Sequence, residues 1–144
     1  MSILNYTTKI DSYKTIAEIQ KILSVKGAQK IIMDNDKAGT PIGLTFIIDW
    51  NGPVAFSLPC KYEGVLNAMK RDKKVPRSAC TMDQALRVGW RILKNWIEAQ
   101  LAIVESEMAY LPEVFLPYAV TKTQRTLFDH ISCDSSLLLV PPKN

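Results

Sequence analysis

The side chains that could perform catalysis in this chain are few and widely spaced. Asp34, Asp36 and Asp49 are the only candidates for the clustered carboxylates that hold a metal ion in a nuclease. Asp34 and Asp36 also resemble the start of a calcium loop, but Thr45 stands where that loop needs a bidentate glutamate. We therefore interpret residues 34–39 as a turn, and hairpin geometry is expected to scatter the three carboxylates.

Nucleophilic catalysis is also not indicated. A serine or cysteine nucleophile needs a neighbouring base, and the chain has a single histidine, His130, with no G-x-S-x-G sequence around any serine. The six glycines are scattered and form no phosphate-cradling loop. Cys60, Cys80 and Cys133 lack C-x-x-C spacing, so we interpret them as reduced thiols. We expect no enzymatic activity, no cofactor and no bound metal.

Positive charge is concentrated in one short stretch. Residues 70–77 carry five basic side chains and one acidic side chain, whereas the remaining thirteen basic and thirteen acidic residues cancel. This stretch is either a contact for phosphate groups or a solvated linker between two helices. Basic residues of the following helix would add a ridge for phosphates, or else form a solvated face. The candidates for nucleic-acid or phosphate binding are Lys70, Arg71, Lys73, Lys74, Arg77, Arg87, Arg91 and Lys94.

One long helix is predicted for residues 81–111. Thr81 and Gln84 have the spacing of a capping box, and Pro112 follows the far end. The apolar side chains cover nearly half of the helical circumference, which is wider than the stripe that one core requires. We therefore expect this helix to pack against a sheet on one side and against a second protein chain on the other, so that the protein is a homo-oligomer, a dimer or higher.

Two polar residues, Gln100 and Glu107, fall inside the predicted apolar arc of this helix. Because buried polar groups need hydrogen-bonding partners, they either meet a partner across an interface or pocket, or lie at its wet edge. The full set of candidates for an interface or pocket is Trp90, Trp96, Gln100, Glu107, Phe115 and Tyr118.

The elements before the long helix are predicted from periodicity. Alternating apolar residues indicate a three-stranded antiparallel meander, and Asn51-Gly52 is a strong hairpin signal. Thr15 and Glu18 have the spacing of a second capping box, which begins a helix that Gly27 ends. The expected order is a short strand (4–10), a helix (15–27), three strands (29–33, 42–50 and 54–58) and a short helix (62–69).

After the long helix, residues 112–120 lie between prolines and are expected to be extended and to fold back along that helix. A short helical turn is expected at 126–131, and the apolar tail at 137–140 should dock on its own body or on a neighbouring chain. The fold class is α+β. We expect one domain over residues 1–144, with a meander part (1–80), a long helix (81–111) and an extended C-terminal segment (112–144).

Composition is that of a globular protein. The 144 residues are 47% hydrophobic and 22% charged, which is ordinary for a soluble domain. No secretory leader pattern opens the chain, and no apolar run approaches the length of a membrane span. We expect a cytoplasmic protein, located in the cytoplasm of a host cell, that does not associate with membranes.

Several segments resemble a family of small uncharacterised phage and prophage proteins. The resemblance is carried by residues 87–100 (RVGWRILKNWIEAQ) and 113–118 (EVFLPY), and it extends to 14–19 and 56–59. Gly89 stands where the family pattern has alanine, and Ser57 stands where it has a basic residue. The resemblance implies a phage or mobile-element origin and does not bring an activity or site residues with it.

Three functions follow from these features. The first is an oligomeric, non-enzymatic binding protein that acts on host defence or nucleic-acid metabolism by binding a nucleotide, a nucleic acid or a host protein. The second is a DNA- or RNA-binding accessory protein of phage replication or recombination. The third is a small hydrolase or nuclease that uses Asp34, Asp36 and Asp49.

Overall fold

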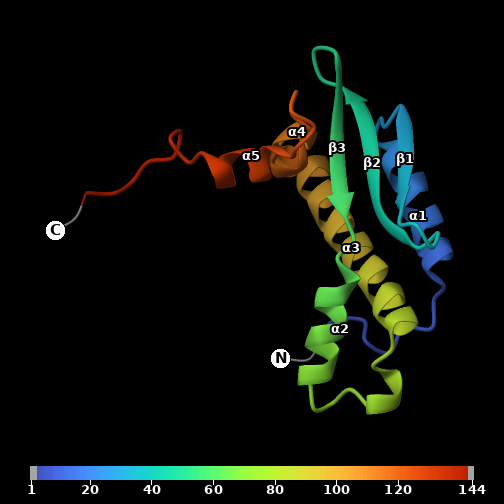
Figure 1. The fold of residues 1–144 in the computed structure, drawn as a ribbon. Coiled ribbons are helices and arrows are strands. Elements are labelled where there is room, and N and C mark those ends of the chain that lie inside the picture. The colour runs from blue at the N-terminus through green and yellow to red at the C-terminus, as the bar shows by residue number, and fades with distance from the viewer. Residues whose placement is uncertain (1–2, 143–144) are drawn as a thin grey trace.

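The computed structural model describes residues 3–142, and these form two layers, a three-stranded antiparallel sheet and a set of helices that cover one face of it (Figure 1). The predicted α+β class is confirmed. The strands are β1 (Lys30–Asn35), β2 (Pro41–Asp49) and β3 (Pro53–Pro59), in the order β1-β2-β3. The helices are α1 (Ser12–Val25), α2 (Tyr62–Arg71), the 3-10 helix η1 (Arg77–Ala79), α3 (Met82–Glu105), α4 (Leu111–Phe115), the 3-10 helix η2 (Leu116–Tyr118) and α5 (Leu127–Cys133).

The sheet follows the predicted meander. Phe46 of β2 lies opposite Phe56 of β3, and the two rings stack with their centroids 5.3 Å apart. Asn51 and Gly52 adopt φ angles of 54° and 111°, which is the positive-φ geometry that a tight hairpin requires. Because side chains alternate along each strand, one face of the sheet is buried against the helices while Ile32 on the other face is exposed.

The long helix α3 lies at the centre of the helical layer. The Thr81 hydroxyl accepts a hydrogen bond from the Gln84 backbone N–H at 3.1 Å, so the predicted N-cap is confirmed. The fully buried Trp90 donates its indole N–H to the Pro41 carbonyl oxygen, which fixes α3 against β2. Helices α1 and α2, the sheet and α4 all contact α3. Most of the wide apolar surface of this helix is therefore covered within one chain, while Ile92, Leu93 and Trp96 remain partly exposed.

The prediction that this helix continues to residue 111 was wrong. Helix α3 ends at Glu105, and Glu107 adopts a left-handed φ of 60°. The backbone N–H of Glu107 donates to the Val104 carbonyl oxygen and that of Met108 donates to the Ile103 carbonyl oxygen. These bonds satisfy the carbonyl groups at the end of the helix, so the chain turns before it reaches Pro112.

The predicted N-terminal strand at 4–10 was also wrong. These residues form turns with Asn5 at a φ of 64°, and they pair with no strand of the sheet. The Gln84 side-chain amide donates to the carbonyl oxygens of Tyr6 and Thr8 at 3.0 and 2.8 Å. The segment therefore crosses the start of α3, and Gln84 binds it instead of completing a capping box.

The first helix begins three residues earlier than predicted. Asp11 caps α1 by accepting from the Tyr13 backbone N–H, while Thr15 is fully buried inside the helix. A cap at Thr15 was therefore wrong, because Asp11 supplies an equivalent oxygen ahead of it. The predicted end of this helix is confirmed, since Gly27 has a φ of 108° just after the last helical residue.

Residues 112–120 are not extended as predicted. Leu111–Phe115 form α4 and Leu116–Tyr118 form η2, with Pro112 and Pro117 in the first turns of these helices. A proline in a first turn removes no hydrogen bond that the helix needs. Phe115 is fully buried, and its ring meets those of Phe46 and Trp96 edge to face. The helical turn predicted at 126–131 is confirmed as α5.

Candidate functional site

An apolar groove of about 490 Å³ opens between the end of β3, α2, the middle of α3, η2 and α5. Its lining comes from segments that are far apart in the chain, and only one lining residue is charged, Lys61. The residues that line the groove are Leu58, Pro59, Cys60, Lys61, Val65, Gly89, Ile92, Leu93, Trp96, Pro117, Tyr118 and Phe128. Its volume lies within the range of ligand-binding sites.

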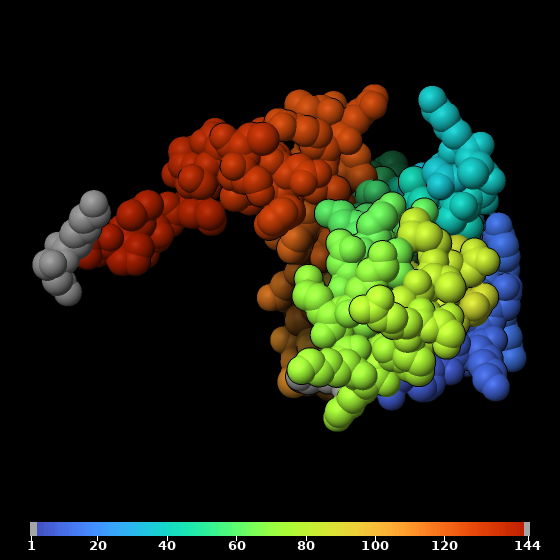
Figure 2. Space-filling view, turned by 60° about the horizontal axis from the view of Figure 1, so that its bottom comes forward, coloured from blue at the N-terminus to red at the C-terminus, as the bar shows by residue number. Residues whose placement is uncertain are grey.

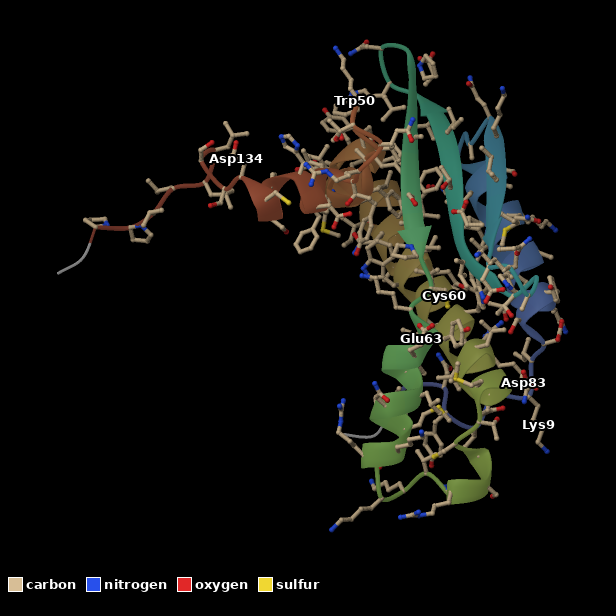
Figure 3. All side chains as sticks on the ribbon, in the orientation of Figure 1. Lys9, Trp50, Cys60, Glu63, Asp83 and Asp134 are labelled. Carbon is tan, nitrogen blue, oxygen red and sulfur yellow. The ribbon has the colours of Figure 1, made fainter. Side chains whose placement is uncertain are left out.

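The floor of the groove is built where β3 passes into α2. Cys60 lies just beyond the end of β3 (Figure 3). Its backbone N–H donates to the Ile42 carbonyl oxygen at 2.8 Å, which holds the connection against the sheet. Helix α3 packs against this connection at Gly89. A Cβ atom at position 89 would lie 3.0 Å from the Cys60 Sγ. The glycine therefore allows α3 to approach the connection closely.

Aromatic side chains form one wall of the groove. The Trp96 ring meets both Phe115 and Tyr118 edge to face, with centroids 5.5 Å apart in each case. Phe115 is in turn packed on the stacked pair of Phe46 and Phe56. The wall therefore continues the main core outward. Phe128 of α5 stands at the rim, with 63% of its surface exposed.

The groove has little capacity for acid–base or nucleophilic chemistry. Burial, together with the negative charge of Glu63, raises the pKa of the Cys60 thiol to about 12. Because the thiolate is the reactive form of cysteine, Cys60 stays protonated and inert near neutral pH. Lys61 contributes a positive charge at the rim. The arrangement suits the binding of an apolar group with an anionic neighbour.

A second feature, the basic end, consists of five cations in the last turn of α2 and in the segment between α2 and α3. Residues 62–80 lie at one end of the molecule (Figure 1), and Figure 2 shows this end from the front (green to yellow-green). Lys70, Arg71, Lys73, Lys74 and Arg77 are all exposed, and among residues 3–142 no ion pair involves them.

The loop that carries the basic end is held in place by the core. The Asp72 carboxylate accepts hydrogen bonds from the backbone N–H groups of Ile3 and Lys74, at 3.2 and 2.9 Å. The bond from Lys74, followed by that from Ile3, holds the pKa of Asp72 below its usual value despite partial burial. Val75 is buried against Met69 and Val88. The cations therefore project from an ordered loop.

The other three predicted phosphate contacts lie elsewhere and have partners. The Arg91 guanidinium donates to the Glu18 carboxylate at 2.8 Å, and the Lys94 Nζ lies 3.5 Å from the same carboxylate. Arg87 donates to the Gln84 side-chain oxygen. Arg91 and Lys94 therefore link α3 to α1 through Glu18, whereas the five cations of the basic end form no ion pair among residues 3–142.

The six predicted interface or pocket residues also lie in different environments. Trp96 and Tyr118 line the groove, whereas Trp90 and Phe115 are fully buried in the core. Gln100 is half-buried on α3 outside the groove lining. Glu107 is exposed in the turn after α3, so its predicted place in the apolar arc was wrong, because the helix ends before it.

The three aspartates have structural roles in different places. Asp34 accepts a hydrogen bond from the Thr45 hydroxyl, Asp36 accepts from two backbone N–H groups of its own turn, and Asp49 accepts from the Gly52 N–H at the other end of β2. Within residues 3–142, no three His, Cys, Asp or Glu side chains converge on a possible metal position. His130 lies on α5.

The C-terminal arm, which we define as residues 126–142, begins with α5 and leads away from the body (Figure 1). It carries exposed apolar side chains. Its helix α5 contacts η2. The tail does not dock on its own body. The exposed fractions of its apolar residues are 83% for Leu137, 56% for Leu138, 91% for Leu139 and 80% for Val140.

Of the groove lining only Trp96 and Tyr118 were among the predicted interface or pocket residues, because the lining is assembled from five elements by tertiary packing. The only local signal for it is a glycine inside a helix, Gly89, which is unfavourable unless something packs closely there. Along the part of the chain that the structure describes, no helix is long and apolar enough to cross a membrane. Comparisons with family models, curated proteins and solved structures gave no match to this chain.

Proposed function

We propose that this chain is a non-enzymatic binding protein whose groove receives an extended apolar segment of a protein partner. The observation that supports the proposal is the groove itself, a concave apolar surface with an aromatic wall and a single charged side chain. Exposed apolar surfaces of this kind mark interaction sites. The phosphate groups of a nucleotide carry several negative charges, and the groove lining offers a single cation, Lys61.

The sequence resemblance suggests where such a protein acts. A phage or prophage origin implies that the partner belongs to host defence or to nucleic-acid metabolism, in the cytoplasm of the host. Oligomerisation is part of the proposal, and it now rests on the exposed arm, because most of the apolar surface of α3 is covered within the chain.

The proposal is tested by selecting random displayed peptides on the full-length chain, immobilised sparsely so that copies do not contact one another. We expect recovered peptides to be apolar, with an acidic residue next to the apolar run. Phe128→Ala should weaken their binding about tenfold, because aromatic side chains dominate such contacts. Trp50→Ala is the matched control, since Trp50 is an exposed aromatic residue at the distant β2–β3 hairpin (Figure 3). Equal binding to wild type and Phe128→Ala would refute the proposal.

A second candidate function, nucleic-acid binding, is favoured by the basic end. Five exposed cations without ion-pair partners in the described part of the chain project from a loop that the core holds in place. A preordered set of cations loses less conformational freedom on binding phosphates than a flexible linker would. No aromatic residue lies among them, so contacts would be to the backbone of the nucleic acid and not to its bases.

This second function predicts a steep dependence of affinity on salt, because bound phosphates release counterions. Fluorescence anisotropy with labelled single- and double-stranded DNA and RNA measures it. Replacing both Lys73 and Lys74 by Glu should lower the affinity and flatten the slope of log affinity against log salt by about 2. Lys30→Glu on β1 is the control for charge, since Lys30 is exposed and far along the chain from the basic end. No binding at low salt would remove this candidate.

A further inference from the structure

The arm carries an apolar sequence that finds no partner in its own chain. Four consecutive residues, Leu137 to Val140, are exposed in spite of their apolar side chains. The arm leads away from the sheet and from α2 (Figure 1). The Leu138 backbone N–H donates to the Ser135 carbonyl oxygen, and the Asp134 carboxylate accepts from the Ser136 N–H. These bonds form a local turn just before the apolar run.

The groove offers the complementary surface. Its lining is mostly apolar and has one charged group, the ammonium of Lys61, while the basic end lies at the far end of α2, with Glu63 in the first turn of that helix. The arm contains two acidic residues, Asp129 and Asp134, and no lysine or arginine between positions 126 and 142, where His130 is the one further titratable base. An apolar segment that carries a carboxylate and an apolar groove with Lys61 in its lining therefore match in polarity, and Lys61 supplies one positive charge for that carboxylate beside the negative charge of Glu63.

The arm is anchored next to the groove that its own chain carries. Phe128 of α5 lines the groove, and the chain then leaves the body after Cys133. Two copies placed face to face could each present a tail to the other, and an exchange of identical segments produces a closed symmetric dimer. Burial of four apolar side chains against aromatic walls favours such an exchange.

We propose that Leu137–Val140 of one copy occupy the groove of a second copy, and that the exchange of two arms closes a dimer. This inference rests on the proposed function and names the partner of the groove. Asp134 of the incoming arm (Figure 3) lies next to Lys61 of the acceptor, and Trp96 and Tyr118 of the acceptor contact the leucines.

The oligomeric state of full-length variants tests the inference by sedimentation velocity over a series of concentrations. The wild type should sediment as a dimer that dissociates on dilution. Leu137→Asp combined with Leu139→Asp should sediment as a monomer at concentrations where the wild type is a dimer. Ser135→Asp with Ser136→Asp adds the same charge to the same arm without changing the apolar residues, and this control should remain dimeric. A monomeric wild type, or a dimeric leucine variant, overturns the inference.

A synthetic peptide of residues 134–142 separates the failure of this inference from failure of the proposed function. The peptide should bind the monomeric leucine variant, and both Phe128→Ala and Lys61→Glu in that variant should weaken its binding. If selected peptides bind the groove while this peptide does not, the arm exchange is wrong and the proposed function stands. If neither binds, both are wrong.

Discussion

A Cβ atom on Gly89 would lie 3.0 Å from the Cys60 Sγ. The middle of α3 therefore packs so closely against the segment between β3 and α2 that a side chain at position 89 would press on this sulfur atom. The other neighbours of such an atom, Val65 Cγ2 at 3.5 Å and Tyr62 Cβ at 3.7 Å, are at ordinary contact distances. The sulfur atom is therefore the specific obstacle to alanine at this position.

This contact predicts that substitutions at positions 89 and 60 are coupled. Alanine favours a helix over glycine by about 1 kcal/mol, but Gly89→Ala alone should lower the free energy of unfolding by about 1 kcal/mol because the buried sulfur must shift. In a Cys60→Ala background the sulfur is gone, and Gly89→Ala should then raise it by about 1 kcal/mol. Urea unfolding of the four variants measures the coupling. Additive effects would show that Cys60 does not limit position 89.

The raised pKa of Cys60 predicts an unreactive thiol. With a pKa of about 12, roughly one Cys60 in ten thousand carries a thiolate at pH 8, and the side chain is only 5% exposed. In a Cys80→Ser, Cys133→Ser variant, a disulfide reagent such as 5,5′-dithiobis(2-nitrobenzoic acid) should modify Cys60 only as the protein unfolds. The same variant in denaturant is the control and should release one thiol rapidly. Rapid reaction of the native variant contradicts the burial of Cys60.

Glu18 predicts a dependence of stability on pH. Partial burial raises the pKa of Glu18, but the hydrogen bond from Arg91 and the charges of Lys94 and Arg91 outweigh it and hold the pKa below its usual value. A carboxyl group with a lowered pKa in the folded state stabilises the protein above its unfolded pKa of about 4.3, and that stabilisation is lost as the pH falls through the folded value.

The corresponding experiment compares wild type with Glu18→Gln. The substitution should lower the free energy of unfolding by about 1 kcal/mol at pH 7, since the pair is only partly buried, and the difference should shrink as the pH falls below about 4. Glu107→Gln is the control, because Glu107 is exposed and makes no ion pair among the described residues. If the difference in free energy of unfolding between wild type and Glu18→Gln instead grows as the pH falls, the ion pairs of Glu18 are not its source.

Local patterns in the sequence predicted the elements whose residues determine their own geometry. Asn51-Gly52 fixes the hairpin through its positive φ angles, and Thr81 caps α3 through a contact three residues away. The prediction of a strand at 4–10 was wrong because alternation of apolar residues does not supply a sheet edge to pair with. The Gln84 side chain binds that segment instead. The prediction that residues 112–120 are extended was wrong because a proline fits the first turn of a helix as well as it fits an extended chain.

The candidate site was less predictable, because it depends on which helix faces meet. The sequence places Arg91 and Lys94 on a polar face of the long helix, but only the packing of α1 against α3 brings Glu18 to them. Cys60 and Trp96 are separated by 35 residues in the sequence and meet in the groove lining only in the folded chain. The five cations of the basic end were found from the sequence because they are neighbours in the chain.

The end of α3 gives a last prediction. Glu107 holds a left-handed φ of 60°, a conformation that costs a residue with a Cβ about 1 kcal/mol and costs glycine almost nothing. Glu107→Gly should therefore raise the free energy of unfolding by roughly 0.5–1 kcal/mol, after the greater freedom of glycine in the unfolded chain is included. Ala102→Gly is the matched control, because Ala102 is exposed inside α3 and the same new residue should lower the free energy of unfolding by about 1 kcal/mol there. Urea unfolding measures whether each substitution raises or lowers the free energy of unfolding. If Glu107→Gly destabilises the protein as much as Ala102→Gly does, position 107 is helical in solution, and the long helix continues toward Pro112 as its apolar periodicity predicts.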